Sequence, residues 1–223
     1  MEVKVCGMRE PENMTAVAAL KPDYMGFIFY ERSKRYCGGR AGIDGEYSSD
    51  GMDPVLVKGL PEGVEPVMVT VDLPEREILE IADRYGFRTV QLHGSESPSV
   101  CRSLREQGMR VIKAVGISTE ESFANLEPYE GVVDLFVFDT SCPEKGGSGK
   151  KFDWSLLNAY TGSTDFLLSG GIGPEDAEAV AHVTHPHFRG VDLNSRFEAA
   201  PALKDVVKLK DFMEGIMHNE DVL

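Results

Sequence analysis

The sequence predicts a single-domain α/β protein, a (β/α)8 TIM barrel, and three observations favour this fold class. Short apolar or β-branched runs recur about every 20 to 30 residues. Most of these runs are followed by a segment with helical periodicity, and that alternation builds a parallel sheet. The 223 residues also match the usual size of such a barrel. We therefore expect residues 1–223 to form one domain.

Eight strands are expected, which is the number that closes this kind of barrel. They are Val3–Val5, Tyr24–Phe29, Val67–Val71, Thr89–Leu92, Arg110–Val115, Leu135–Phe138, Phe166–Leu168 and Gly190–Leu193. A doubly wound sheet has the same alternation, but it usually has fewer strands and a glycine-rich turn after the first one. Here the glycine-rich turns come late in the chain, which favours the barrel.

Helical periodicity occupies most intervals between these strands. The expected helices are Asn13–Leu20, Glu75–Tyr85, Ser97–Gln107, Trp154–Ala159, Pro174–His182 and, after the last strand, Leu203–Met217. The interval Cys37–Met52 differs, because it is rich in Gly, Ser and Asp. We expect an irregular loop there in place of the second barrel helix, followed at most by a short helix at Pro54–Leu60.

The charge and the cysteines narrow the choice of partners and compartment. The net charge of -14 disfavours non-specific binding to nucleic acid or anionic lipid. No apolar run reaches the roughly 18 residues that span a membrane, and no signal sequence is evident. The four cysteines lie far apart without a CxxC pair, so we expect reduced thiols in a cytoplasmic protein. The sequence leaves monomer and homodimer open.

Three expected strand ends carry small residues that suit an anion. In this fold the active site forms at the carboxyl ends of the strands, and small residues let backbone N–H groups approach a phosphate closely. The three segments are Gly146-Gly147-Ser148-Gly149, Ser169-Gly170-Gly171 and Asp192-Leu193-Asn194-Ser195. Any one of them can be a simple turn. Their occurrence at consecutive strand ends predicts a phosphate site.

Two side chains on roughly opposite sides of the expected barrel mouth can transfer protons. Cys6 follows the first strand, where a thiol can be a base, a nucleophile or simply a small buried residue. Asp139 ends the sixth strand in LFVFDT, where an acid is more often functional than not. Together they predict isomerisation by proton transfer, which needs neither a metal nor a redox cofactor.

Polar residues after two other strands are further candidates. Arg35 can bind a carboxylate through two hydrogen bonds or belong to a solvated run of charges. Gln91 and His93, in VQLHG, can point into the mouth or brace neighbouring loops. Three histidines, His182, His185 and His187, have the spacing of a metal cluster. They precede the eighth strand, on the face of the barrel away from the active site, so no catalytic metal is expected.

A set of motifs stands in an order and spacing that is specific in combination. The motifs are KVCGMREPENM, MGFIFYERSKRY, VQLHGSES, VIKAVG, FDT followed by GGSGKKFDW, LLSGGIGPEDA and GVDLNSRFEAAPALKD. With them the chain resembles the phosphoribosylanthranilate isomerase family of tryptophan biosynthesis over nearly its whole length. The resemblance implies a cofactor-free Amadori rearrangement of a small phosphorylated substrate.

The resemblance also implies a role for each main candidate. It puts the general acid, which opens the ribose ring, on Asp139 and the general base, which removes the C2 proton, on Cys6. It puts the anthranilate carboxylate on Arg35 and the phosphate on the small-residue loops. The chain departs from the family in its third strand, VMVTVDL, in its Gly/Ser-rich second helix region, and at Arg196, where glycine is common.

Other phosphosugar barrels remain as alternatives. A ribulose-phosphate epimerase would need metal-binding His and Asp residues at strand ends. An indole-glycerol-phosphate synthase would use a lysine acid, for which Lys113 is the candidate. A non-catalytic phosphosugar-binding barrel would need neither Cys6 nor Asp139. Bifunctional isomerases of histidine and tryptophan synthesis have aspartates at both positions, so Cys6 disfavours dual activity.

Overall fold

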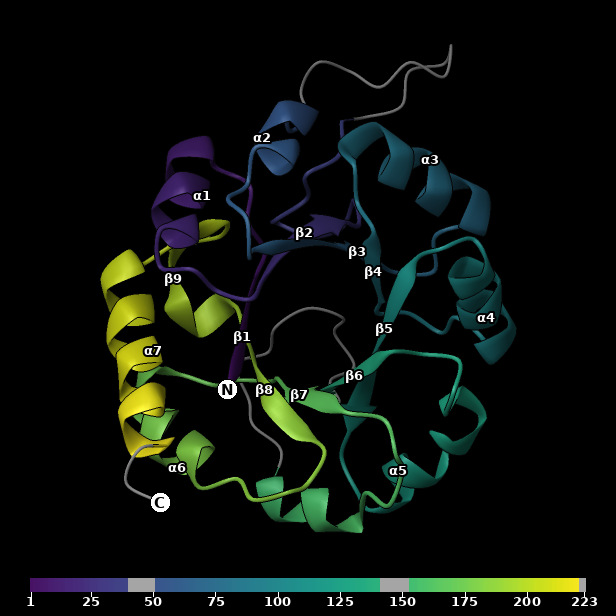
Figure 1. Cartoon of the computed structure of the whole chain (residues 1–223), viewed down its shortest axis with the longest axis vertical. Coiled ribbons are helices and arrows are strands. Elements are labelled where there is room, and N and C mark those ends of the chain that lie inside the picture. The colour runs from purple at the N-terminus through teal and green to yellow at the C-terminus, as the bar shows by residue number, and fades with distance from the viewer. Residues whose placement is uncertain (40–50, 141–152, 221–223) are drawn as a thin grey trace.

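The computed structural model describes residues 1–39, 51–140 and 153–220. Within them eight parallel strands form a closed barrel, in which β8 pairs with β1 (Figure 1). The strands are β1 (Glu2–Cys6), β2 (Tyr24–Phe29), β3 (Glu65–Thr70), β4 (Thr89–Leu92), β5 (Arg110–Ile117), β6 (Leu135–Thr140), β7 (Phe166–Leu168) and β8 (Phe188–Leu193). The predicted fold class is confirmed, and β2, β4 and β7 have the predicted bounds.

The helices surround the barrel as an outer ring (Figure 1). The α-helices are α1 (Pro11–Ala18), α2 (Pro54–Lys58), α3 (Glu75–Tyr85), α4 (Pro98–Glu106), α5 (Glu121–Ala124), α6 (Ala177–Ala181) and α7 (Val206–Glu220). The 3-10 helices are η1 (Glu127–Tyr129), η2 (Trp154–Ala159), η3 (Pro174–Asp176) and η4 (Ser195–Phe197). Helix α7 packs against both α6 and α1, which completes the ring. In the described part of the chain, no helix is long and apolar enough to cross a bilayer.

Three expected helices differ from the structure. Trp154–Ala159 is a 3-10 helix, and Pro174–His182 divides into η3 and α6. The helix expected at Leu203–Met217 begins only at Val206, because β10 (Leu203–Lys204) pairs antiparallel with β9 (Glu198–Ala200). Over one or two turns, 3-10 and α-helices bury similar residues, so periodicity did not separate them. The unpredicted β9–β10 pair matters for the site described below.

Both faces of the strands are buried, as in other parallel barrels. Outward side chains such as Val3 and Val5 pack beneath the helices. Inward side chains such as Val67, Ile112 and Leu167 fill the barrel with a separate apolar cluster. The alternation along β1 turns Lys4 and Cys6 inward. Lys4 is completely buried, so a charged group lies among the side chains that point into the barrel.

Candidate active site

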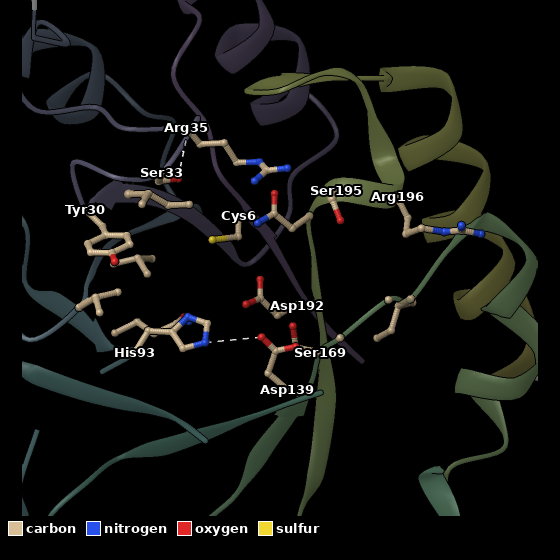
Figure 2. A pocket seen from close by; sticks show the side chains of 18 residues that line it. Cys6, Tyr30, Ser33, Arg35, His93, Asp139, Ser169, Asp192, Ser195 and Arg196 are labelled. Atoms are coloured by element: carbon tan, nitrogen blue, oxygen red, sulfur yellow. Dashed lines mark hydrogen bonds and ion pairs between the residues drawn. The ribbon is translucent and has the colours of Figure 1, made fainter. Parts of the chain in front are cut away.

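A pocket of about 840 Å³, its open mouth included, lies at the carboxyl ends of the strands (Figure 2). It brings together the predicted residues Cys6, Arg35, Gln91, His93, Asp139, Gly170, Gly171, Asp192, Asn194 and Ser195. The other predicted residues, Gly147, Ser148 and Gly149, lie outside the described residues, as does most of the predicted loop Cys37–Met52.

Cys6 is the last residue of β1, and its side chain is 4% exposed. Gly26 of β2 lies directly against it, since a Cβ added to Gly26 would stand 2.8 Å from the sulfur. Burial raises the pKa of the Cys6 thiol above its ordinary value, while the Lys4 ammonium acts in the opposite direction through its charge and a hydrogen bond. The protonated thiol is therefore the main form near neutral pH.

Asp139, near the end of β6, faces the same pocket and is 21% exposed. Its Oδ1 accepts a hydrogen bond of 2.8 Å from the Thr140 N–H, and its Oδ2 lies 3.5 Å from Nε2 of His93. Gly170, in the turn after β7, approaches this carboxylate and has a φ of +86°. A Cβ on Gly170 would stand 2.8 Å from Oδ1 of Asp139 and would collide with Thr140. Glycine is thus required here by close approach as well as by backbone conformation.

Arg35 is held in one orientation over the mouth. Its Nε and Nη2 donate hydrogen bonds of 2.7 and 2.6 Å to the two carboxylate oxygens of Glu198. Its stem crosses Gly7, where a Cβ would stand 2.5 Å from Cδ of Arg35. Burial would raise the pKa of Glu198, but Arg35 and Lys204 together lower it. The guanidinium therefore belongs to an ion-pair network and not to a solvated run of charges.

A buried ion pair lies beside Cys6. Nζ of Lys4 is 3.0 Å from both carboxylate oxygens of Asp192. Burial alone would lower the pKa of Lys4, but the Asp192 carboxylate reverses this effect and the pKa is raised. As viewed in Figure 2, Asp192 lies between Cys6 and Asp139. The carboxylate of this ion pair thus lies between the two predicted proton-transfer groups, Cys6 and Asp139.

Two loops of small residues meet at one side of the pocket. Gly170 and Gly171 both have left-handed φ values, +86° and +73°. Within the described residues, neither of their N–H groups donates a backbone hydrogen bond, which suits an anion. Ser195 begins η4 after the neighbouring strand. Arg196 forms an ion pair with Glu175 and points away from Cys6 and Asp139 (Figure 2).

Gln91 and Asn194 both line the pocket, but in the described structure only Asn194 has a hydrogen-bond partner for its side-chain oxygen. Gln91 is 1% exposed, and in the described structure its Oε1 has no hydrogen-bond partner. A buried amide oxygen without a partner is costly, so this atom suits a donor group of a ligand. Oδ1 of Asn194 accepts a hydrogen bond of 2.8 Å from Lys204 and so braces the ion-pair network of Arg35.

Several lining residues stand outside the motifs and candidate positions of the sequence. They form an apolar wall with two hydroxyl groups, built from Ile28, Tyr30, Ser33, Val69 and Val71. Alternation along the second and third strands would have indicated Ile28, Val69 and Val71 as inward-facing. Alternation in the first strand likewise places Lys4 on the face of Cys6, whereas no local signal connects Glu198 with Arg35.

Lys113 and the histidines have structural partners. Nζ of Lys113 lies 3.2 Å from Glu96 and donates to the carbonyl oxygens of Leu92, Gly94 and Ala114, and Lys113 does not line the pocket. This does not support a lysine acid of the synthase type. His187 contacts Asp165, and His185 contacts the carbonyl of Tyr160.

The fold and the site define a (β/α)8-barrel enzyme whose mouth combines a cysteine and an aspartate from opposite strands, a guanidinium held by an ion pair, and two loops of small residues. The model of the N-(5'-phosphoribosyl)anthranilate (PRA) isomerase family matches residues 3–215. The chain belongs to this family, which confirms the resemblance of its motifs.

Individual relatives agree with this assignment. The N-(5'-phosphoribosyl)anthranilate isomerase of Parabacteroides distasonis is 48% identical, over 98% of this chain and 94% of the relative. The crystal structure of phosphoribosyl anthranilate isomerase from Thermotoga maritima has a TM-score of 0.81 at 33% identity, over 98% and 99% of the two chains. A crystal structure of the isomerase with reduced 1-(o-carboxyphenylamino)-1-deoxyribulose 5-phosphate has a TM-score of 0.77 at 30% identity, with the same coverage.

Proposed function

We propose that this chain converts N-(5'-phosphoribosyl)anthranilate into 1-(2-carboxyphenylamino)-1-deoxyribulose 5-phosphate, with Asp139 as general acid and Cys6 as general base. The reaction is an aldose–ketose isomerisation within one molecule, because C1 is reduced while C2 is oxidised and no external electron acceptor takes part. One observation carries the proposal: Cys6 and Asp139, from β1 and β6, face a single pocket that also holds Arg35 and the small-residue loops.

The two ends of the pocket suit the two ends of this substrate. Ile28 and Val69 come from the paired strands β2 and β3, Val71 follows β3, and Arg35 lies in the loop after β2. An aromatic ring can therefore pack against these apolar side chains with its carboxylate directed to the guanidinium. The N–H groups of Gly170 and Gly171 suit the phosphate at the other end. The overall charge of -14 makes such local donors necessary for a substrate that is itself anionic.

The proposed chemistry has two stages, ring opening and then enolisation, and each begins with a proton transfer. Asp139 donates a proton to the ribose ring oxygen, the C1–O bond breaks, and the nitrogen lone pair forms a Schiff base with C1. The Cys6 thiolate then removes the proton from C2, and the electron pair moves to give an enolamine. Protonation at C1 and loss of the hydroxyl proton at C2 give the aminoketose. The proposed cycle involves no cofactor, and both groups return to their starting states.

The proposal is tested by the loss of anthranilate fluorescence when purified protein meets freshly generated phosphoribosylanthranilate. Cys6→Ser and Asp139→Asn should each lower kcat by about 10²–10⁴-fold, the usual contribution of general acid–base catalysis. Both variants should still bind a phosphate-containing product analogue. Absence of turnover by the wild-type protein would overturn the proposal and leave a phosphosugar-binding barrel.

We also infer a single-domain cytoplasmic enzyme. The free thiols of Cys6, Cys37 and Cys101 support this compartment, because cytosolic cysteines are kept reduced. Cell fractionation followed by thiol counting under denaturing conditions checks this inference.

A further inference from the structure

We propose that Lys4 is a positioning residue for the base: its ammonium, held by Asp192, lies next to Cys6 and stabilises the thiolate that removes the C2 proton. This inference rests on the proposed function, which uses Cys6 and leaves the buried Lys4 without a role. It adds a residue that does not itself line the pocket.

The barrel closure holds Lys4 in place. Lys4 lies opposite Asp192 in the register between β1 and β8, and its Nζ is 3.0 Å from both Asp192 oxygens. Lys4 is 0% exposed and Asp192 is 6% exposed. Because both residues lie on paired strands of a closed barrel, the ammonium cannot swing out to water.

Gly26 brings the same ammonium close to the sulfur. A Cβ added to Gly26 would stand 2.8 Å from Sγ of Cys6 and 3.1 Å from Nζ of Lys4. The Cys6 sulfur and the Lys4 nitrogen therefore both lie against Gly26 of β2, from successive inward-facing positions of β1. A side chain at Gly26 would occupy the space beside both groups, so glycine at this position leaves room for them.

A buried charge pair at this position needs an explanation beyond packing. Two apolar side chains would fill the space without the cost of removing two charges from water, and Val67, Ile112 and Leu135 do so elsewhere in the barrel. The Asp192 carboxylate alone would oppose ionisation of Cys6. Lys4 neutralises that carboxylate and adds a favourable charge, so the pair as a whole favours the thiolate.

The other charged groups around Cys6 contribute less or act indirectly. Lys204, on β10, also lowers the pKa of Cys6, and its effect comes after that of Lys4. Arg35 interacts with the thiolate from the loop after β2. Asp139 and His93 act on Asp192 from β6 and the end of β4. Lys4 is thus the main group that opposes the effect of burial on this thiol.

The test measures Cys6 ionisation without turnover, in the full-length folded protein. Iodoacetamide alkylation of Cys6 is followed by peptide mass spectrometry between pH 6 and pH 10, because only the thiolate reacts. In Lys4→Met, alkylation at pH 8 should be about tenfold slower or more, since an adjacent opposite charge usually changes ionisation by at least that factor. The rise of kcat with pH should move to higher pH, with KM nearly unchanged.

Two more variants separate this role from a structural one. Lys4→Met/Asp192→Asn removes both charges and leaves no unpaired buried ion, so it should fold even if Lys4→Met does not, and its Cys6 should also react slowly. Lys113→Met breaks another buried lysine pair and should leave Cys6 alkylation unchanged.

Two results would overturn the inference. One is a wild-type alkylation profile in the double variant. The other is a shifted profile in Lys4→Met with unchanged kcat and an unchanged pH dependence of kcat. Loss of the proposed function looks different, because the wild-type protein would then show no turnover while the charge of Lys4 still controlled alkylation of Cys6.

Discussion

Gly170 is the position where a single added methyl group should damage the site most clearly. Its φ of +86° lies in the left-handed region, which costs an ordinary residue about 1–2 kcal/mol. The new Cβ would also stand 2.8 Å from Oδ1 of Asp139 and would collide with Thr140. We therefore expect Gly170→Ala to displace the end of β6 together with the proposed general acid.

Gly108 provides a matched control, because its φ is +84° and a Cβ there meets nothing within 4 Å. Gly108→Ala should lower the free energy of unfolding by only the left-handed cost, about 1–2 kcal/mol. Gly170→Ala adds overpacking, typically about 1–3 kcal/mol, for a combined loss of roughly 2–5 kcal/mol. The difference between the two variants isolates the contact with β6.

Urea unfolding and the fluorescence assay measure the two consequences. The kcat of Gly170→Ala should fall by about 10²-fold, the effect of misplacing a reacting group by about 1 Å, and Gly108→Ala should keep the wild-type kcat. Equal unfolding free energies and full activity in both variants would refute the reasoning that Gly170 makes room for Asp139.

Three other predictions test the parts of the molecule around the site. Glu198→Gln should raise KM about tenfold, since it weakens the charge-assisted bonds that orient Arg35. Because the pKa of Glu198 is lowered, its stabilising effect is present above the ordinary carboxyl pKa and is lost as the pH falls through the lowered value. Urea unfolding of this variant and the wild type should therefore converge in acid, and a constant difference would contradict the pairing. Lys113→Met should cost about 3–5 kcal/mol of unfolding free energy, because Glu96 stays buried without its cation; a lower kcat at unchanged stability would instead indicate a chemical role. Asp165 lies on the opposite face of the barrel, and Asp165→Asn weakens its partly exposed ion pairing. This variant should lose at most about 1 kcal/mol of stability in thermal unfolding. A changed kcat would contradict the prediction that Asp165 is remote from the reacting groups.

The sequence by itself determined the eight strands, the barrel class and most of the pocket. These features are encoded locally, because β-branched runs, helical periodicity and small residues at strand ends each depend on a few neighbouring positions. Cys6, Asp139 and Gly170 could be found because the carboxyl ends of parallel strands converge on one mouth in this fold. Residues Gly147, Ser148 and Gly149 stay a prediction.

Only the tertiary structure decided which charged side chains of the site form ion pairs and which partner each one has. Arg35 is held by Glu198, which is 163 positions away, and Lys4 is paired with Asp192 across 188 positions. The β9–β10 pair that presents Glu198 replaces the first turn of an expected helix. Such partners depend on barrel closure, strand register and burial, which no short sequence pattern encodes, and the ionisation of Cys6 depends on them in turn.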